Sequence, residues 1–402
     1  MIVTIALATL PVFAQLSLVD AQQRAIANNV DVQTARQMVR QRQADLHLAR
    51  IAAIPHLVGD YSLAPQAGPL DVGTVEQHYF AVGAGVSIND IVASSSAVRA
   101  AADELLAAQR SADAAELAAR ENAAKLYFGA LQAIAVDRIR SDSVRGAERD
   151  RAAADLRVRS GESPQLDVVR ADVTLAQARA EAARARSERA NAVDALATAT
   201  AVDPVRLENL TPELMPGAQP PDVDRAVARA LLVRPELAAL LATLEARNAD
   251  VAKARQAGLP VATIEGGYQK GVDTGIPVQG PQVTAHLDVP LASESVDRVA
   301  SAQAQVDTAY AQLADQRRRI ALEVAAAVRD ARAEAVATLA ADTARDEARR
   351  ALDAVEIGYR EGASSSLDLA QARRTYEQAS VDALVAEYQR ALALATLEVI
   401  IP

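Results

Sequence analysis

The chain contains no cysteine and no tryptophan, and aromatic residues make up only 3% of it. Without cysteine there is no disulfide framework, no thiolate nucleophile and no lipid-modified N-terminal cysteine. The sequence also lacks the ~18–20 uninterrupted apolar residues of a membrane-spanning helix. Acidic residues outnumber basic residues, 52 to 42, which argues against a nucleic-acid partner. Any membrane-spanning part must therefore be made of strands.

The composition predicts packed helices. Apolar residues make up 50% of the 402 residues, which excludes a disordered chain. Most of these apolar residues are alanine, valine and leucine, whose small side chains suit helices that pack closely side by side. We therefore expect a mainly α fold.

The first residues form an apolar segment that ends in Val12-Phe13-Ala14. This ending is typical of a signal-peptidase site, although no lysine or arginine precedes it. We interpret residues 1–14 as a truncated signal peptide. The alternative is an ordinary apolar strand or helix.

The sequence repeats itself once. Residues 21–55 align with residues 226–260 at an offset of 205, and later segments align at an offset of 201. A proline-rich segment, residues 203–222, lies between the two copies. The sequence therefore predicts two structural repeats, residues 15–202 and residues 223–402, joined by this linker.

Both repeats have the same predicted order of helix, two strands, very long helix and shorter helix. The first helices are expected at 18–53 and 223–257, the long helices at 92–160 and 295–361, and the closing helices at 164–201 and 365–399. Apolar residues recur every seven positions in the long helices, a spacing that predicts coiled-coil packing. They are Leu105, Ala112, Ala119, Leu126 and Ala133 in the first, and Val306, Leu313, Ile320 and Ala327 in the second.

Each long helix is expected to end at a glycine, Gly161 or Gly362. Glycine favours the left-handed conformation that follows many helices. Ser163 then reads as the N-cap of the next helix with Pro164 at its first position, and Ser364 or Ser365 caps the corresponding helix in the second repeat. Each repeat is thus predicted to close in a tight helical hairpin.

The segments between the helices alternate between apolar and polar residues. Val283, Ala285, Leu287 and Val289 share one face of their segment, and Phe80 to Ile88 alternates in the same way. This period of two predicts four strands of about 9–11 residues, long enough to cross a bilayer when tilted. A water-soluble sheet with one buried face would show the same alternation.

The number of strands favours the membrane interpretation only if copies of the chain combine. Four strands cannot close a barrel, and an open sheet in lipid would leave backbone groups unpaired. Two chains would supply eight strands and three chains twelve, the latter wide enough for a pore.

In these features the chain resembles the TolC-like outer-membrane efflux proteins over its whole mature length. The resemblance also includes four local motifs. These are Ala25-Ile26-Ala27-Asn28-Asn29 with its repeat Ala230 to Leu237, the alanine-rich helices that end at Pro55 and Pro260, Ser87-Ile88-Asn89-Asp90, and Tyr359-Arg360-Glu361-Gly362-Ala363-Ser364-Ser365-Ser366-Leu367-Asp368-Leu369. The last motif is the most specific.

The resemblance implies a homotrimer. It would have a 12-stranded β-barrel in the outer membrane of a Gram-negative cell and a helical α-barrel in the periplasm. The hairpins at Gly161 and Gly362 would be periplasmic tips that dock on a membrane-fusion adaptor and an inner-membrane pump. The strand connections at 66–77 and 271–282 would be short extracellular loops.

Further tip residues follow from the same resemblance. Asp368 is expected to face the lumen, and Asp167 is expected to hydrogen-bond Tyr359 and hold the tip closed. Alternatively, Asp368 is only a carboxylate in the first turn of a helix, where it is favoured by the dipole. Ser364 and Gln371 stand where some relatives carry charged residues, which puts a charged gate in doubt.

The sequence carries no catalytic motif and predicts no cofactor or metal. Its four histidines, His47, His56, His78 and His286, do not have the spacing of helical metal ligands. Two other functions are kept as alternatives: a periplasmic membrane-fusion adaptor, which would have only one hairpin, and a structural coiled-coil protein without a duct.

Overall fold

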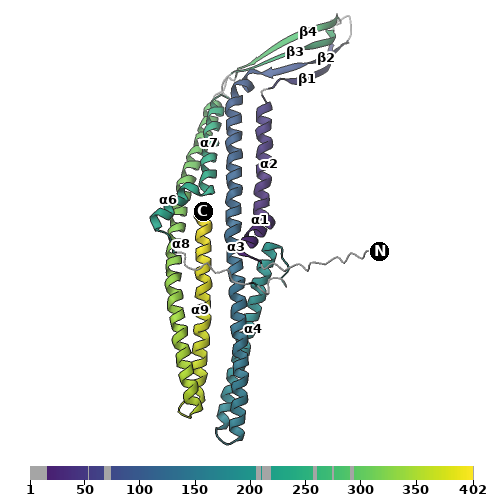
Figure 1. Cartoon of the computed structure of the whole chain (residues 1–402). Coiled ribbons are helices and arrows are strands. Elements are labelled where there is room, and N and C mark those ends of the chain that lie inside the picture. The colour runs from purple at the N-terminus through teal and green to yellow at the C-terminus, as the bar shows by residue number, and fades with distance from the viewer. Residues whose placement is uncertain are drawn as a thin grey trace, which may run out of the picture. The chain divides into compact units, whose positions relative to one another are not determined.

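The computed structural model describes residues 16–52, 54–67, 74–204, 210, 219–256, 260–273, 276–289 and 294–401. The predicted signal peptide, residues 1–14, lies outside these residues, as does most of the predicted linker. The described chain runs twice through the same order of elements (Figure 1). The repeat boundaries at 15–202 and 223–402 stay predictions.

The first repeat contains α1 (Leu18–Asn28), α2 (Val30–Ile51), β1 (His56–Ala67), β2 (Thr74–Ser87), α3 (Ile88–Arg159) and α4 (Gln165–Thr200). The second contains α6 (Val223–Val233), α7 (Pro235–Gln256), β3 (Val261–Asp273), β4 (Ile276–Asp288), α8 (Glu294–Arg360) and α9 (Ser366–Ile400). The duplication predicted from the sequence is therefore visible in the order of the elements.

The prediction of one continuous first helix in each repeat is wrong, because a residue with extended backbone interrupts it. In the first repeat this residue is Asn29, with φ −73° and ψ 125°, and its side chain accepts the N–H groups of Asp31 and Val32. In the second repeat it is Arg234, with φ −62° and ψ 123°. Pro235 follows it and disfavours helical backbone at the preceding residue.

The long helices α3 and α8 contain 72 and 67 residues. Their sevenfold apolar positions lie largely inside, as predicted. In α8, Val306, Leu313 and Ile320 are buried, and in α3, Ala112 and Ala119 are buried. Alanine at several of these positions allows the backbones of neighbouring helices to approach closely.

The four strands form one antiparallel sheet in the order β1-β2-β3-β4. They contain 12 to 14 residues and are longer than predicted. The pairing extends to Ala67 with Thr74 and to Asp273 with Ile276, so the connections are shorter than the predicted 66–77 and 271–282. The pairing depends on backbone groups, which every residue carries whatever its side chain, so it continues beyond the residues whose side chains alternate.

One face of the sheet exposes apolar side chains, including Leu57, Tyr61, Val283 and Leu287, which are 68–82% exposed. The two repeats join within the sheet at Gly83 of β2 and Gly267 of β3, which are opposite each other. A Cβ atom on Gly267 would lie 2.4 Å from the Val82 carbonyl oxygen, so only glycine fits this close approach.

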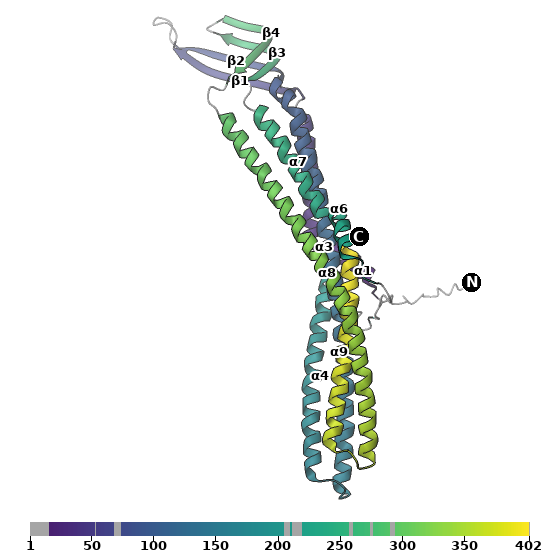
Figure 2. The same cartoon turned by 90° about the vertical axis from the view of Figure 1, so that its left-hand side faces the viewer.

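The compact units of the chain combine parts of both repeats. One unit joins the chain up to Gln33 with Ala115–Arg234 and Arg319–Pro402, and the other joins Thr34–Ala114 with Pro235–Arg318. The core of the first unit contains Tyr127, Phe128, Leu131, Leu196 and Tyr388. Within it α3 and α4 form one hairpin and α8 and α9 the other (Figure 2).

Candidate functional site

The turns of the two hairpins are built in the same way. Gly161 has φ 77° and Gly362 has φ 79°, so both adopt the predicted left-handed conformation. The N–H of Glu162 donates to the Arg157 carbonyl over 2.9 Å, and the N–H of Ala363 donates to the Gly358 carbonyl over 2.7 Å. These bonds satisfy the last carbonyls of α3 and α8 in the Schellman pattern.

The helices that leave the two turns begin differently. Ser365 caps α9, as the sequence predicts, through a capping box. Its side chain accepts from the Asp368 N–H over 3.2 Å, and its own N–H donates to the Asp368 carboxylate over 2.9 Å. At α4 the prediction is wrong, because Pro164 is the cap residue and makes no side-chain cap bond. The proline therefore stands one place before the helix.

Asp368 is an exposed carboxylate that holds the start of α9. It accepts from both the backbone N–H and the hydroxyl of Ser365, the latter over 2.7 Å. These hydrogen bonds stabilise the charged form and lower the pKa of the Asp368 carboxyl. The helix-start role of Asp368 is thus visible, and a role in the lumen stays a prediction.

Two contacts join the tips of the hairpins. The guanidinium carbon of Arg157 in α3 lies 4.2 Å from the ring centroid of Tyr359 in α8. The hydroxyl of Ser366 in α9 donates to Asp167 in α4 over 2.7 Å. The predicted hydrogen bond between Asp167 and Tyr359 is therefore replaced by another one. The Ser366 hydroxyl binds Oδ1 of Asp167, and the Arg157 guanidinium lies over the Tyr359 ring.

A groove of about 1390 Å³ lies between the hairpins, and its lining includes Asp167, Tyr359, Asp150, Glu356 and Arg373. Arg373 of α9 pairs with Asp150 of α3 and, over 2.9 Å, with Glu356 of α8. Burial acts to lower the pKa of Arg373, but the bonds to the two carboxylates outweigh it and raise that pKa. Arg373 therefore ties three helices together as a permanent cation.

A second arginine joins the hairpins farther along α3. Arg140 contacts Glu377 of α9 over 2.6 Å and Glu181 of α4 over 2.8 Å. Ser143 also donates to Glu377. Sequence analysis missed both arginines, because on a helix an arginine near acidic residues is typical of a solvated surface and only the tertiary packing brings these partners together.

The remaining predicted tip residues make only local contacts. The N–H of Ser364 donates to the Gly358 carbonyl over 3.1 Å, and the carbonyl of Gln371 accepts from the Thr375 hydroxyl over 3.0 Å. The structure places Gly161 at the turn of one hairpin and Gly362, Ser364 and Gln371 in the other. The N–H of Gly362 donates to the Tyr359 carbonyl over 3.4 Å within the same turn, whereas Asp167 accepts from Ser366.

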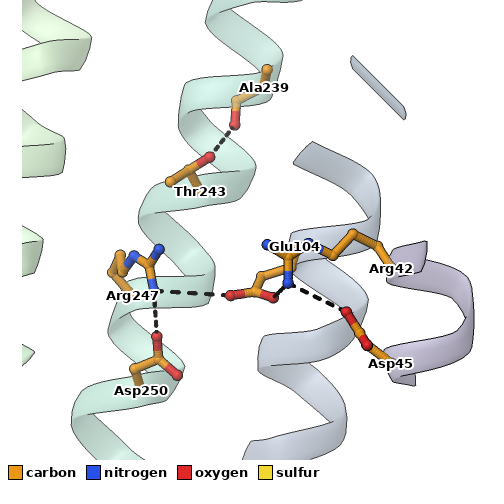
Figure 3. Close-up of polar contacts among 7 residues, drawn as sticks. All are labelled: Arg42, Asp45, Glu104, Ala239, Thr243, Arg247 and Asp250. Atoms are coloured by element: carbon orange, nitrogen blue, oxygen red, sulfur yellow. Dashed lines mark hydrogen bonds and ion pairs between the residues drawn. The ribbon is translucent and has the colours of Figure 1, made fainter. Parts of the chain in front are cut away.

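In the other unit a charged cluster joins α2, α3 and α7 (Figure 3). Glu104 of α3 lies 2.8 Å from Arg42 of α2 and 3.9 Å from Arg247 of α7. The two arginines occupy equivalent positions in the repeats, and each also pairs with the aspartate three residues later, Asp45 or Asp250. One carboxylate thus links the two repeats.

The described residues carry no further site of the usual chemical kinds. No group of three or more histidine, aspartate or glutamate side chains in them could hold a metal ion. None of their helices is long and apolar enough to cross a membrane. The functional features within the described ranges are the paired hairpins and the sheet with its exposed apolar face.

A duplicated chain with paired long hairpins and a small antiparallel sheet defines a class of outer-membrane channel subunits. The sequence matches the outer membrane efflux protein family over residues 21–202 and 226–401. The chain belongs to this family, and it is an outer-membrane efflux channel of Gram-negative bacteria, not an enzyme. The resemblance noted in the sequence is confirmed, and the adaptor and structural coiled-coil alternatives are wrong.

Solved structures share the fold at low sequence identity. The Campylobacter jejuni CmeC outer membrane channel is 19% identical with a TM-score of 0.84, covering 97% of this chain and 86% of that one. The open state of the Neisseria gonorrhoeae MtrE outer membrane channel is 22% identical with a TM-score of 0.79, covering 96% and 89%. The outer membrane protein VceC of Vibrio cholerae is 17% identical with a TM-score of 0.81, covering 96% and 97%. A comparison with curated proteins finds no match.

Proposed function

We propose that three copies of the chain form a passive export duct that works with a periplasmic adaptor and an inner-membrane pump. The observation that carries this proposal is the open four-stranded sheet with its exposed apolar face. In lipid, the edges of β1 and β4 require partners, because unpaired backbone groups cost several kcal/mol each. Copies of the same chain supply such partners, and twelve strands enclose a water-filled lumen.

The hairpin turns are the proposed docking surface for the adaptor. Both turns expose a short backbone segment whose geometry is set by a left-handed glycine, and the two are joined through Arg157, Tyr359, Asp167 and Ser366. Each chain has two such turns, so three chains would offer six related docking positions to adaptor subunits.

The assembly is tested by fractionation and by mass. The protein is expected in the outer-membrane fraction, and light scattering in mild detergent is expected to give three protein masses per particle. Recovery from the soluble periplasm would contradict the membrane location. A folded particle with the mass of one chain would contradict the trimer.

Asp368→Asn tests whether this carboxylate lines the mouth of the duct. Three lumen-facing carboxylates would attract cations, so the substitution is expected to reduce cation selectivity and weaken block by polyvalent cations in planar bilayers. Ser365→Ala is the matched control, because it disturbs the same capping box but keeps the charge. Unchanged selectivity and block in Asp368→Asn would leave Asp368 with only its role at the start of α9.

A further inference from the structure

Lys270 is the only lysine or arginine in the four described strands of the sheet. It lies in β3, directly opposite Gln279 of β4 on one side and Phe80 of β2 on the other. Phe80 is in turn opposite Tyr61 of β1. These four residues form one row across the sheet, and all four are exposed. We call them the Lys270 row.

The Lys270 row lies on the apolar face of the sheet. Residues that are opposite each other in an antiparallel pair share a face, and along a strand every second residue does. The row therefore shares its face with Leu57 and Val283, which are 82% and 78% exposed. Glu265 and Gln269 of β3 belong to the other face and are half-buried. The one cation of the sheet is thus placed among apolar side chains and not among the polar ones.

The row is also where the apolar part of this face ends. Between the helices and the row, the residues that β3 and β4 contribute to this face lie within 262–268 and 281–287, and none of them is charged. The eight residues from 262 to Lys270 span about 26 Å along a strand, which is roughly 20 Å of bilayer height at a tilt of about 40°. That height is close to the apolar band of about 25 Å in outer-membrane barrels. Tyr268 and the two aromatic residues of the row form an aromatic belt at the edge of this band.

The row faces the outer leaflet of the membrane. The helices join one end of the sheet, since β1 follows α2 and β2 runs into α3 (Figure 1). Lys270 lies near the other end, three residues before β3 ends at Asp273. Because the helical part of these channels is periplasmic, the hairpin end of the sheet is directed outward. In Gram-negative bacteria the outer leaflet is made of lipopolysaccharide, whose lipid A carries phosphate groups at the level of the headgroups.

We propose that the Lys270 row binds a phosphate group of lipid A in the outer leaflet. The Lys270 ammonium supplies a charge-assisted hydrogen bond to the phosphate, and the Gln279 amide beside it supplies a further donor. A lysine side chain keeps its methylene groups on apolar surface while its ammonium reaches the headgroup level. Phosphates crowded in one leaflet repel one another, so a fixed cation at the protein surface lowers that repulsion. The site requires the sheet to be part of the proposed barrel, so it rests on the proposed function.

A phosphate carried by a lipid fits the row better than a free phosphate ion. Adjacent strands are about 4.8 Å apart, so Lys270 and Gln279 offer two donors side by side on an open surface. Between the row and the helices, Ile264, Tyr268 and Val283 expose apolar surface that suits acyl chains. Binding of the chains holds the linked phosphate beside Lys270 at a high effective concentration, an advantage that a free ion lacks.

Native mass spectrometry of the detergent-solubilised full chain measures this binding together with the number of chains per particle. The probes are lipid A with both phosphates and the same lipid A after enzymatic removal of its phosphates. Lys270→Gln is expected to weaken binding of the phosphorylated lipid by about five- to tenfold, the effect of one cation near a charged headgroup. The unchanged chain and the variant are expected to bind the dephosphorylated lipid equally.

Two variants are the matched controls. Lys270→Arg keeps the cation and is expected to bind the phosphorylated lipid nearly as well as the unchanged chain. Lys253→Gln removes an exposed lysine from α7, outside the sheet, and is expected to leave the binding unchanged. An equal loss in Lys253→Gln and Lys270→Gln would overturn the site, because the effect would then reflect only the total charge of the chain.

The remaining outcomes separate the site from the proposed function. Equal binding of the phosphorylated lipid by the unchanged chain and by Lys270→Gln would overturn the site. Displacement of the lipid by inorganic phosphate at equal concentration would overturn lipid A as its ligand. A trimer without Lys270-dependent binding would overturn this site and leave the proposed function intact. A particle of one chain with Lys270-dependent binding would support the site and contradict the trimer.

Discussion

Tyr127→Ala is expected to lower the free energy of unfolding by about 3–5 kcal/mol, because removing a fully buried aromatic side chain leaves a cavity. Tyr127 is 0% exposed and lies at the centre of the core made by Phe128, Leu131, Leu196 and Tyr388. Its ring meets that of Phe128 edge to face, with centroids 5.5 Å apart. The measurement is the urea midpoint of the detergent-solubilised protein, followed by far-UV circular dichroism.

Tyr127→Phe is the matched control. The Tyr127 hydroxyl donates to the Leu16 carbonyl over 3.3 Å, so removing only the hydroxyl is expected to cost about 1 kcal/mol. Similar midpoints for the alanine and phenylalanine variants would mean that the ring contributes little and that the helices around it collapse to fill the space.

Local patterns were enough to predict most of the elements. The period of two identifies the four strands, and the sevenfold spacing identifies α3 and α8, because both patterns record which side chains face a neighbour. Gly161 and Gly362 mark the ends of the long helices because only glycine adopts φ near 80° without strain. These features are determined within a few residues of where they appear.

The errors came from signals that compete locally. In the sequence Asn29 looks like an ordinary helix residue, but in the structure its side chain caps α2. Arg234 also looks like a helix residue, but Pro235, which follows it, disfavours helical backbone there. The contacts between hairpins could not be predicted. Asp167 and Ser366 are 199 positions apart, and nothing in either local sequence selects the other as a partner. The candidate site was therefore predicted as two turns but not as a set of contacts between them.

Gly362→Val is expected to leave the trimer assembled but to impair export severely. At φ 79° a β-branched residue is strained by roughly 1–3 kcal/mol, although no other atom lies within 4 Å of the added Cβ. The strain therefore acts on the turn and its bond from Ala363 to Gly358, not on the packing. If only the native turn binds the adaptor, this cost weakens binding by roughly 5- to 150-fold.

Gly362→Asn separates backbone strain from the mere presence of a side chain, because asparagine tolerates the left-handed conformation better than other residues. Gly362→Asn is expected to export nearly as well as the unchanged protein. Cells that carry Gly362→Val are expected to accumulate the compound that the duct normally exports. Both are measured beside the amount of trimer in the outer membrane. Equal export by the two variants would show that the turn conformation does not control docking. If the turn only docks a partner, its strain leaves the core near Tyr127 and the sheet unchanged, and the trimer still forms. Loss of the trimer in Gly362→Val would therefore show that this turn is needed for assembly.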